Sequence, residues 1–271
     1  MSPKKNLNDL NFIDAIGNNH ARATNPRIVS LVPSVTELLF DLDLEANLLG
    51  RTAFCIHPKG RVKNIKSVGG TKQINMTKLR ALEATHVIVN IDENPKEMVE
   101  EIAAMGIEIV VTHPETPEDN IDLFNMLGGI FDREAEAEAL CAPLNQALGE
   151  IHALRKSRPE NRVLYLIWKD PWMIVSQDTY AAQMLALINW QTVGHDPDIR
   201  YPRIDDMSQL VADSDRILFS SEPFPFTEDH MEEFRKEFPC DGKHLQLVDG
   251  EMITWYGSRA IEAIRYMGEL A

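Results

Sequence analysis

Cys55 and His57 are the two side chains whose types and spacing could bind a metal ion. They lie one residue apart in the stretch FCIHP, Phe54–Pro58. A cysteine thiolate and a histidine imidazole are typical zinc ligands, and one loop could offer both. A structural site needs four ligands, however, and no two of the eight histidines lie four residues apart. His113 and His195 are the histidines that could approach the loop across a cleft. Cys55 and His57 are therefore only weak candidates for direct metal binding.

Sequence motifs of catalysis or phosphate binding are missing. The chain has no Gly-x-Ser-x-Gly elbow, no Walker loop and no dinucleotide fingerprint, and Gly69-Gly70-Thr71 is too short for a phosphate loop. We therefore predict no catalytic residue and expect that the protein is not an enzyme.

The segment 51–80 reverses the sign of the chain's charge. It holds eight lysines or arginines and no aspartate or glutamate, whereas the whole chain has a net charge of −15. Such a segment could face an anionic ligand, because opposite charges steer encounter. Lys59 and Arg61 would then pair with anionic groups of that ligand. The alternative is a solvated loop whose charge is balanced by acidic residues nearby in space.

Aromatic residues gather at predicted strand ends and loops. Three of the four tryptophans lie there: Trp168, Trp172 and Trp255. Tyr201, Phe224, Phe226 and Tyr256 occupy similar positions in the second half of the chain, and Phe54 does so in the first half. Strand-end tryptophans often serve core or lid packing. Several on one edge favour a wide, flat, apolar ligand pocket.

The first half of the chain alternates strands with helices. Ser34 and Glu37 predict a capping box for a helix over 35–42. The other expected helices cover 76–83, 95–105 and 117–128, and the expected strands cover 27–34, 48–50, 86–90 and 107–112. This alternation predicts a parallel sheet, whose ligands bind beyond the carboxyl ends of the strands. The rule selects Pro33-Ser34, 54–57, 90–94 and His113-Pro114.

The second half repeats the α/β pattern less regularly. Apolar runs predict strands over 162–168, 172–176, 216–220 and 244–248. Helices are expected over 178–189, 206–213, 228–237 and 257–270, the first capped by Asp178 and the third by Thr227.

One long helix is expected between the halves. Residues 132–157 are rich in Ala, Glu and Leu, with acidic residues at the start and basic residues at the end. Pro143 should bend the helix near Leu140 if it bends at all. We therefore predict an α/β fold with two Rossmann-like lobes, 1–131 and 158–271, joined by the helix 132–157. A single connecting helix should permit little relative motion of the lobes.

Charge and composition exclude several classes of function. A net charge of −15 argues against nucleic acid as a partner. Three widely spaced cysteines predict neither disulfides nor a zinc knuckle. The chain shows no signal peptide and no run of about 20 apolar residues that could insert in a membrane. As written, it is expected to be a soluble, monomeric, cytoplasmic protein, or a periplasmic one if the sequence is a trimmed mature form.

Three segments of the first half resemble the helical-backbone (class III, TroA-like) solute-binding proteins of ABC transporters. They are RIVSLVPSVTELLFDL, VGGTKQINMTKLRALEATHVIVN and MGIEIVVT. Within that group, FCIHP, ENPKE, SEPFPF and WYGSR resemble a subgroup described as helical-backbone metal receptors. The resemblance implies an importer receptor for cobalamin, haem or iron-siderophores, with the ligand between the lobes. It also implies docking of the importer permease by an acidic residue on each lobe, here Glu93 or Glu97 and Glu222 or Glu228. The three histidines and one acid of the metal-ion branch cannot be placed in this sequence.

We therefore predict a solute-binding protein that holds a metal chelate of corrinoid, haem or siderophore type. No resident cofactor is expected apart from such a ligand. The alternative is a cytoplasmic cofactor- or metal-handling protein, or a sensor, that reuses the fold. The residues expected to contact the ligand are Ser34, Phe54, His57, Lys59, Arg61, Asn90, Trp168, Trp172, Tyr201, Glu222, Phe224, Trp255 and Tyr256.

Overall fold

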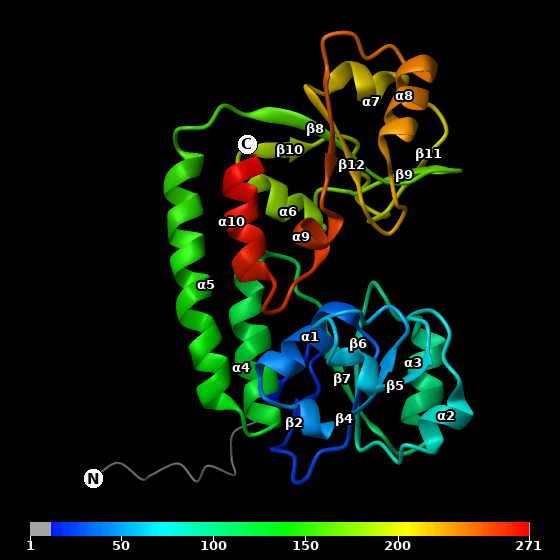
Figure 1. Cartoon of the computed structure of the whole chain (residues 1–271), viewed down its shortest axis with the longest axis vertical. Coiled ribbons are helices and arrows are strands. Elements are labelled where there is room, and N and C mark those ends of the chain that lie inside the picture. The colour runs from blue at the N-terminus through cyan, green and yellow to red at the C-terminus, as the bar shows by residue number, and fades with distance from the viewer. Residues whose placement is uncertain (1–11, 271) are drawn as a thin grey trace. The chain divides into compact units, whose positions relative to one another are not determined.

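The computed structural model describes residues 12–270, which form two compact units (Figure 1). Unit 1 contains residues 12–114, 119–143 and 256–259. Unit 2 contains residues 115–118, 144–255 and 260–270. Short pieces of chain therefore belong to a different unit from their sequence neighbours, which the sequence pattern does not indicate.

Unit 1 is built on a five-stranded parallel sheet with the order β5-β4-β3-β6-β7. Its strands are β3 (Ile28–Ser30), β4 (Leu48–Thr52), β5 (Lys66–Gly69), β6 (His86–Asn90) and β7 (Glu108–Thr112). A small antiparallel hairpin of β1 (Phe12–Ile13) and β2 (Asn19–His20) precedes them. The chain returns from β5 to pair β6 with β3, as in a Rossmann-like lobe.

Successive residues of these strands point to opposite faces, and helices cover both. Val29, Val87 and Val111 belong to a core cluster that includes Leu79 and Ile102 from two helices. Those helices are α2 (Met76–Arg80) and α3 (Lys96–Ala103). Unit 1 also holds α1 (Pro33–Asp41), which contacts β3 and β4, and α4 (Asn120–Ile130). The apolar runs of the strands are thus buried on both sides, as expected for a parallel sheet.

Unit 2 contains a mixed sheet with the order β11-β9-β8-β12-β13, and β10 pairs with the start of β8. The strands β8, β10, β12 and β13 run parallel to one another. At one edge, β9 pairs antiparallel with β8 and β11 pairs antiparallel with β9. The strand bounds are β8 (Asn161–Trp168), β9 (Trp172–Ile174), β10 (Trp190–Thr192), β11 (Arg203–Ile204), β12 (Arg216–Ser220) and β13 (His244–Val248).

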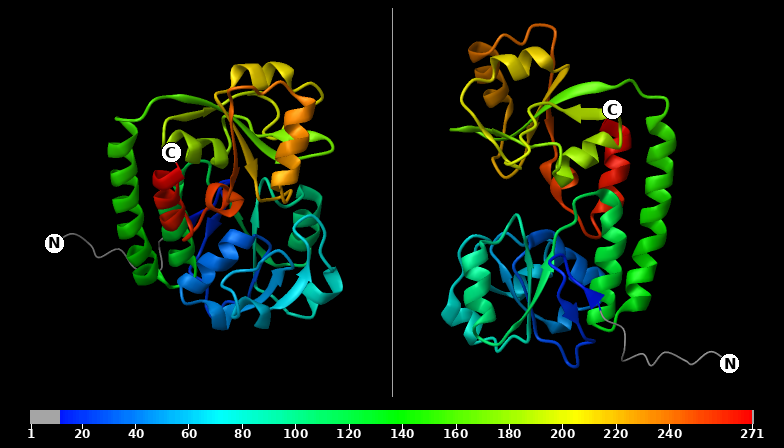
Figure 2. Two further views of the ribbon diagram at one scale, coloured as in Figure 1. Left: turned by 45° about the horizontal axis from the view of Figure 1, so that its top comes forward. Right: turned by 180° about the vertical axis from the view of Figure 1, so that it is seen from behind.

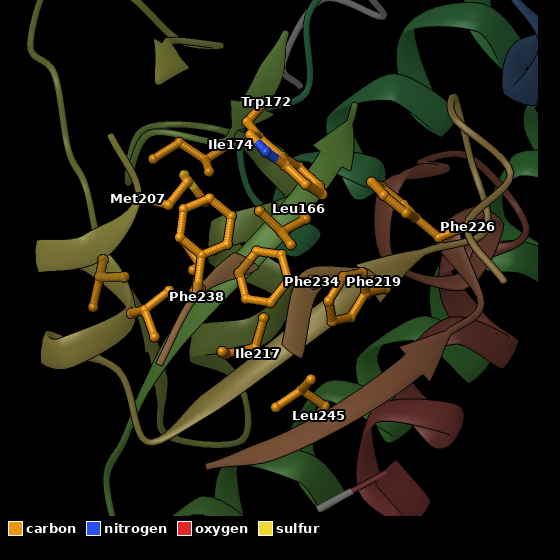
Figure 3. Close-up of a cluster of buried hydrophobic side chains, with 13 residues drawn as sticks. Leu166, Trp172, Ile174, Met207, Ile217, Phe219, Phe226, Phe234, Phe238 and Leu245 are labelled. Carbon is orange, nitrogen blue, oxygen red and sulfur yellow. The ribbon is translucent and has the colours of Figure 1, made fainter. Parts of the chain in front are cut away.

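One face of this sheet carries an aromatic core (Figure 3). Trp172 stacks on Phe226 and meets Phe234 edge-on, with ring centroids 6.1 and 5.3 Å apart. The helices of unit 2 are α6 (Tyr180–Ala186), α7 (Ser208–Asp213), α8 (Glu228–Glu237), α9 (Gly250–Thr254) and α10 (Ala260–Leu270). Thr227 caps α8 through a capping box with His230, so the expected cap is confirmed.

Helix α5 (Glu134–Arg155) is the long helix expected between the halves (Figure 2). Pro143 lies inside it, and the division between the two units falls just after this proline. Glu134 and Glu136 occupy its first turn and Arg155 its last, as the helix dipole favours. The expected α/β fold, with two Rossmann-like lobes and one long helix, is confirmed.

Two predicted helix caps are wrong. Helix α1 begins at Pro33, so Ser34 lies within its first turn and makes no cap bond. Proline suits a first helical position because it has no N–H to satisfy. Helix α6 begins at Tyr180, and Thr179 rather than Asp178 caps it by accepting a bond from Ala182 N. None of the helices within residues 12–270 combines the length and apolar character needed to cross a membrane.

Candidate ligand-binding loops

In unit 1 the strand order reverses between β3 and β6, and this is where parallel sheets bind ligands. Two buried asparagines shape the loop after β6. Asn94 accepts a hydrogen bond from Asn90 N at 2.9 Å and donates to Thr71 O at 2.9 Å. Asn90 donates to Thr112 O at 3.0 Å and accepts from Asp92 N at 2.8 Å. Asn90 is buried and fixes this loop through bonds that use its side-chain oxygen and one amide proton within the unit.

Exposed apolar side chains stand on the loops beyond β4 and β6. Phe54 is 61% exposed, and Ile56 and Ile91 are also exposed. A Cβ atom added to Gly70 would lie 3.3 Å from the Phe54 ring, so the ring rests on this glycine. Leaving such groups in water costs free energy that a ligand could recover. These residues form the apolar part of the candidate surface on unit 1.

The segment Tyr256–Arg259 is a strap from the end of the chain that is bound to unit 1. Tyr256 donates to Glu93 Oε1 at 3.0 Å, and Gly257 N donates to Asn120 Oδ1 at 2.5 Å. Arg259 makes two bonds of 2.8 Å to the carboxylate of Glu37. The WYGSR stretch therefore fixes the Glu93 loop, and Glu37 serves this strap instead of the expected capping box.

Tyr256, in this strap, and Ser34, in α1, are both buried. Burial and the neighbouring Glu93 carboxylate raise the pKa of Tyr256 well above its ordinary value, so the phenol keeps its proton and donates. Ser34 is 4% exposed, and its side chain interacts with the Tyr256 phenol, which opposes this rise in the pKa of Tyr256.

The structure gives Cys55 a packing role. Its sulfur is buried and accepts a bond from Thr36 Oγ1 at 3.0 Å. Burial raises the pKa of the thiol, whereas metal binding requires the thiolate. In residues 12–270 no three His, Cys, Asp or Glu side chains gather as a metal-binding group. His57 is half-buried and lies on the same loop.

The basic segment is partly neutralised within unit 1. Arg61 pairs with Glu45 and lies over the Phe40 ring, 5.0 Å from its centroid. Lys72 donates to the backbone carbonyl oxygen of Asp92 at 2.9 Å, a bond that does not neutralise its charge. Arg61 therefore fits the alternative in which nearby acidic residues balance the charge of the basic segment. Lys59 is exposed.

In unit 2 the loop after β12 is organised by Glu222. Its Oε1 atom accepts hydrogen bonds from Thr254 Oγ1 at 2.8 Å and Trp255 Nε1 at 2.7 Å. Burial raises the pKa of this carboxyl above its ordinary range, against the lowering effect of the two bonds. Trp255 is buried, so its indole anchors the loop.

Trp168 and Trp172 have different environments. Trp168 ends β8, is 38% exposed and meets Phe224 edge-on, 5.6 Å between ring centroids. Trp172 is 9% exposed and belongs to the aromatic core of Figure 3. We therefore place Trp168 and Phe224 on the candidate surface of unit 2 and assign Trp172 to its core.

A pocket of about 490 Å³ lies in unit 2 beside the loop between β10 and β11. Tyr201, an expected ligand contact, is one of its lining residues; the others are Gly194, His195, Asp196, Ile199, Pro202, Arg203, Ile204 and Leu210. Sequence reasoning selected only Tyr201 as a ligand contact here, because the pocket needs β9 and α7 to bring its walls together.

Residues 28–239 match the family described as periplasmic binding protein, so the chain belongs to this family. A vitamin B12-binding protein of Pectobacterium atrosepticum is 23% identical over 189 residues, 68% of this chain and 67% of that protein. The fold is similar to the periplasmic vitamin B12 binding protein BtuF of Vibrio cholerae, with a TM-score of 0.78 and 17% identity over 89% of this chain and 94% of that one. It is also similar to the periplasmic heme-binding protein RhuT of Roseiflexus, with a TM-score of 0.77 and 19% identity over 89% of this chain and 96% of that one.

Proposed function

We propose that this chain is a solute-binding protein for a metal chelate of the corrinoid, haem or siderophore type. The observation that carries the proposal is the set of exposed aromatic and aliphatic side chains on the carboxyl-end loops of the sheets. Phe54 and Ile91 supply them in unit 1, and Trp168 supplies one in unit 2. Flat chelates offer large apolar faces to such rings. The names of the relatives, which bind vitamin B12 or heme, support the same ligand class.

The proposed contacts differ in their exposure to solvent. Exposure favours Phe54, Trp168, Tyr201 and Lys59 as direct contacts, with Phe224 and His57 half-buried beside them. Of the other expected residues, Asn90, Glu222, Trp255 and Tyr256 bond inside their units. Ser34 is buried in α1, Arg61 pairs with Glu45, and Trp172 lies in the core of unit 2.

The test is a titration of the purified chain with cyanocobalamin, hemin and ferrichrome, followed by absorbance and tryptophan fluorescence. We expect one of them to bind at micromolar concentration or tighter. Phe54→Ala and Trp168→Ala should each weaken that binding about tenfold, which corresponds to about 1.4 kcal/mol.

Two variants with matched exposure serve as controls. Ile16→Ala removes an exposed apolar side chain of the β1–β2 hairpin, and Leu247→Ala removes one of β13 that is as exposed as Trp168. Neither should change the affinity. Equal losses in the controls and in the two site variants would show that general destabilisation, not ligand contact, explains the result.

We propose ABC import as the role and an importer permease as the partner. Glu97 and Glu228 are exposed on α3 and α8, whereas Glu93 and Glu222 accept bonds inside their units. Glu97 and Glu228 are therefore the better docking candidates. The family description favours the periplasm. Cell fractionation that finds the protein in the cytoplasm would instead support the alternative of a cytoplasmic cofactor-handling protein or sensor.

A further inference from the structure

The loop that walls the pocket of unit 2 is held in place by its own hydrogen bonds. Ser176 Oγ accepts from Asp196 N at 3.0 Å and donates to Ile199 O at 2.7 Å. Ile174 N, in β9, donates to Pro202 O at 3.2 Å. Gly194 has a φ of +84°, and a Cβ atom there would lie 2.4 Å from Ile174 Cδ1, so only glycine fits. The wall is thus formed before a ligand arrives, which lowers the cost of binding.

His195 is an exposed lining residue of this pocket, and one of its ring nitrogens is already engaged. Gln177 N donates a hydrogen bond to His195 Nδ1 at 3.4 Å. A backbone N–H can only donate, so Nδ1 must present its lone pair. A neutral imidazole then carries its proton on Nε2. The ring therefore has an N–H group to offer and no second lone pair.

The hydrogen bond from Gln177 N to His195 Nδ1 disfavours metal binding by His195. Coordination through Nε2 would require the proton to move to Nδ1, where it would face the Gln177 N–H and break that bond. The carboxylate of Asp196 is occupied on one oxygen, because Oδ1 accepts from Asp198 N and Ile199 N at 2.9 and 3.1 Å. Arg203 and Tyr201, which also line the pocket, carry further donors.

We infer that His195 donates its Nε2–H to a peripheral acceptor oxygen of the ligand, an amide carbonyl or a carboxylate, and does not bind the ligand's metal. This inference rests on the proposed function and adds the chemistry that the pocket recognises. Corrin side-chain amides and porphyrin carboxylates both offer such oxygens, and the test separates them by the probe that binds.

The test compares three variants with whichever of cyanocobalamin and hemin binds the wild-type chain. Glutamine can place an N–H near the position of Nε2, whereas asparagine reaches only to the position of Nδ1. We expect His195→Gln to keep affinity within about threefold, and His195→Asn and His195→Ala to lose about tenfold. His244→Ala, an exposed histidine of β13, is the control and should bind as the wild type does.

The absorption spectrum of the bound chelate separates the two roles of the ring. A donor to the periphery leaves the metal's axial ligands unchanged, so His195→Ala should give the wild-type band positions at saturation. A shifted Soret or corrin band in that variant would overturn the inference, and so would wild-type affinity in His195→Ala. A wild-type chain that binds neither probe would overturn the inference as well. Binding of ferrichrome in that case would leave the proposed function standing, and failure of all three chelates would remove both.

Discussion

The Glu222 carboxylate is used inside the loop after β12, where its Oε1 atom accepts hydrogen bonds from Trp255 Nε1 and Thr254 Oγ1. Trp172 was selected from its place after a strand, and the structure puts it in the core. Both outcomes have one cause. The sequence shows that a polar or aromatic residue stands at a strand end, but exposure depends on neighbours far along the chain.

Glu222 gives a test of this internal role. In the folded state, burial raises the pKa of the Glu222 carboxyl above its ordinary value near 4.5. The folded chain therefore binds this proton more tightly than the unfolded chain does. This carboxyl therefore favours folding below about pH 4.5, and that contribution is lost as pH rises through the folded pKa. Glu222→Gln keeps an acceptor oxygen without the charge, and we expect its melting temperature to fall less than that of the wild type between pH 4 and pH 8.

Glu222→Ala is the contrasting variant. It leaves the indole N–H of Trp255 without its acceptor, which should cost about 1–3 kcal/mol at every pH. Urea unfolding at pH 4 and pH 8 measures both variants. Equal destabilisation by Gln and Ala at both pH values would contradict the internal role of the carboxylate oxygen.

For His86 we expect the opposite dependence of folding stability on pH. Burial lowers its pKa below the ordinary value near 6.5, although Glu108 lies 3.4 Å from its Nε2 and favours the charged form. The coulombic interaction with His20 also disfavours protonation of His86. The unfolded chain thus binds the proton first, and the contribution of His86 to stability is lost as pH falls below about 6.5. His86→Gln should flatten the stability curve between pH 7 and pH 5, and an unchanged slope in urea unfolding would refute this.

Among the elements, strands with several apolar residues in a short stretch were predicted best. The strands β6, β12 and β13 have the expected bounds, because each holds three apolar residues within five positions. The short elements β5, β10, β11 and α9 were missed. They have two to five residues, too few for a period to show, and pairing with neighbouring strands or packing stabilises them.

The strap Tyr256–Arg259 is the element whose role the sequence hides most completely. Its contacts with Glu37, Asn120 and Glu93 join residues more than 100 positions apart, so no local pattern reports them. The WYGSR stretch was singled out only by resemblance. Its density of bonds to unit 1 explains why these residue types stand together.

Arg259 and Glu37 allow the strap to be tested. Both side chains are largely buried, and the pair has the two parallel bonds that only arginine offers. Arg259→Ala leaves the Glu37 carboxylate buried without its partner, which should destabilise unit 1 by about 3–5 kcal/mol. Arg259→Lys should recover only part of this loss.

A double-mutant cycle with Glu37→Gln supplies the control for the strap. Removing both charges should cost less than removing the arginine alone, because no uncompensated charge then stays buried. Denaturant unfolding gives the four free energies. Additive effects of the two substitutions would show that the pair does not couple.

At the level of the whole chain, class and family were predictable and the division into units was not. The alternation of strands and helices predicted two α/β lobes, and the structure has a main sheet in each unit. The match of residues 28–239 to the periplasmic binding protein family confirms the predicted family. The expected boundaries, 131 and 158, placed α5 between the lobes. In the structure the first half of α5 belongs to unit 1 and the second half to unit 2. Helix periodicity marks where α5 lies but carries no information about which core each turn joins.

The central claim, that this chain binds a metal chelate, is tested most directly by native mass spectrometry after incubation with an equimolar mixture of cyanocobalamin, hemin and ferrichrome. We predict one new species whose mass equals the chain plus a single intact chelate, and Phe54→Ala should reduce its abundance while Ile16→Ala should not. A spectrum that shows only the free chain, or the chain with a bare metal ion, would contradict the claim.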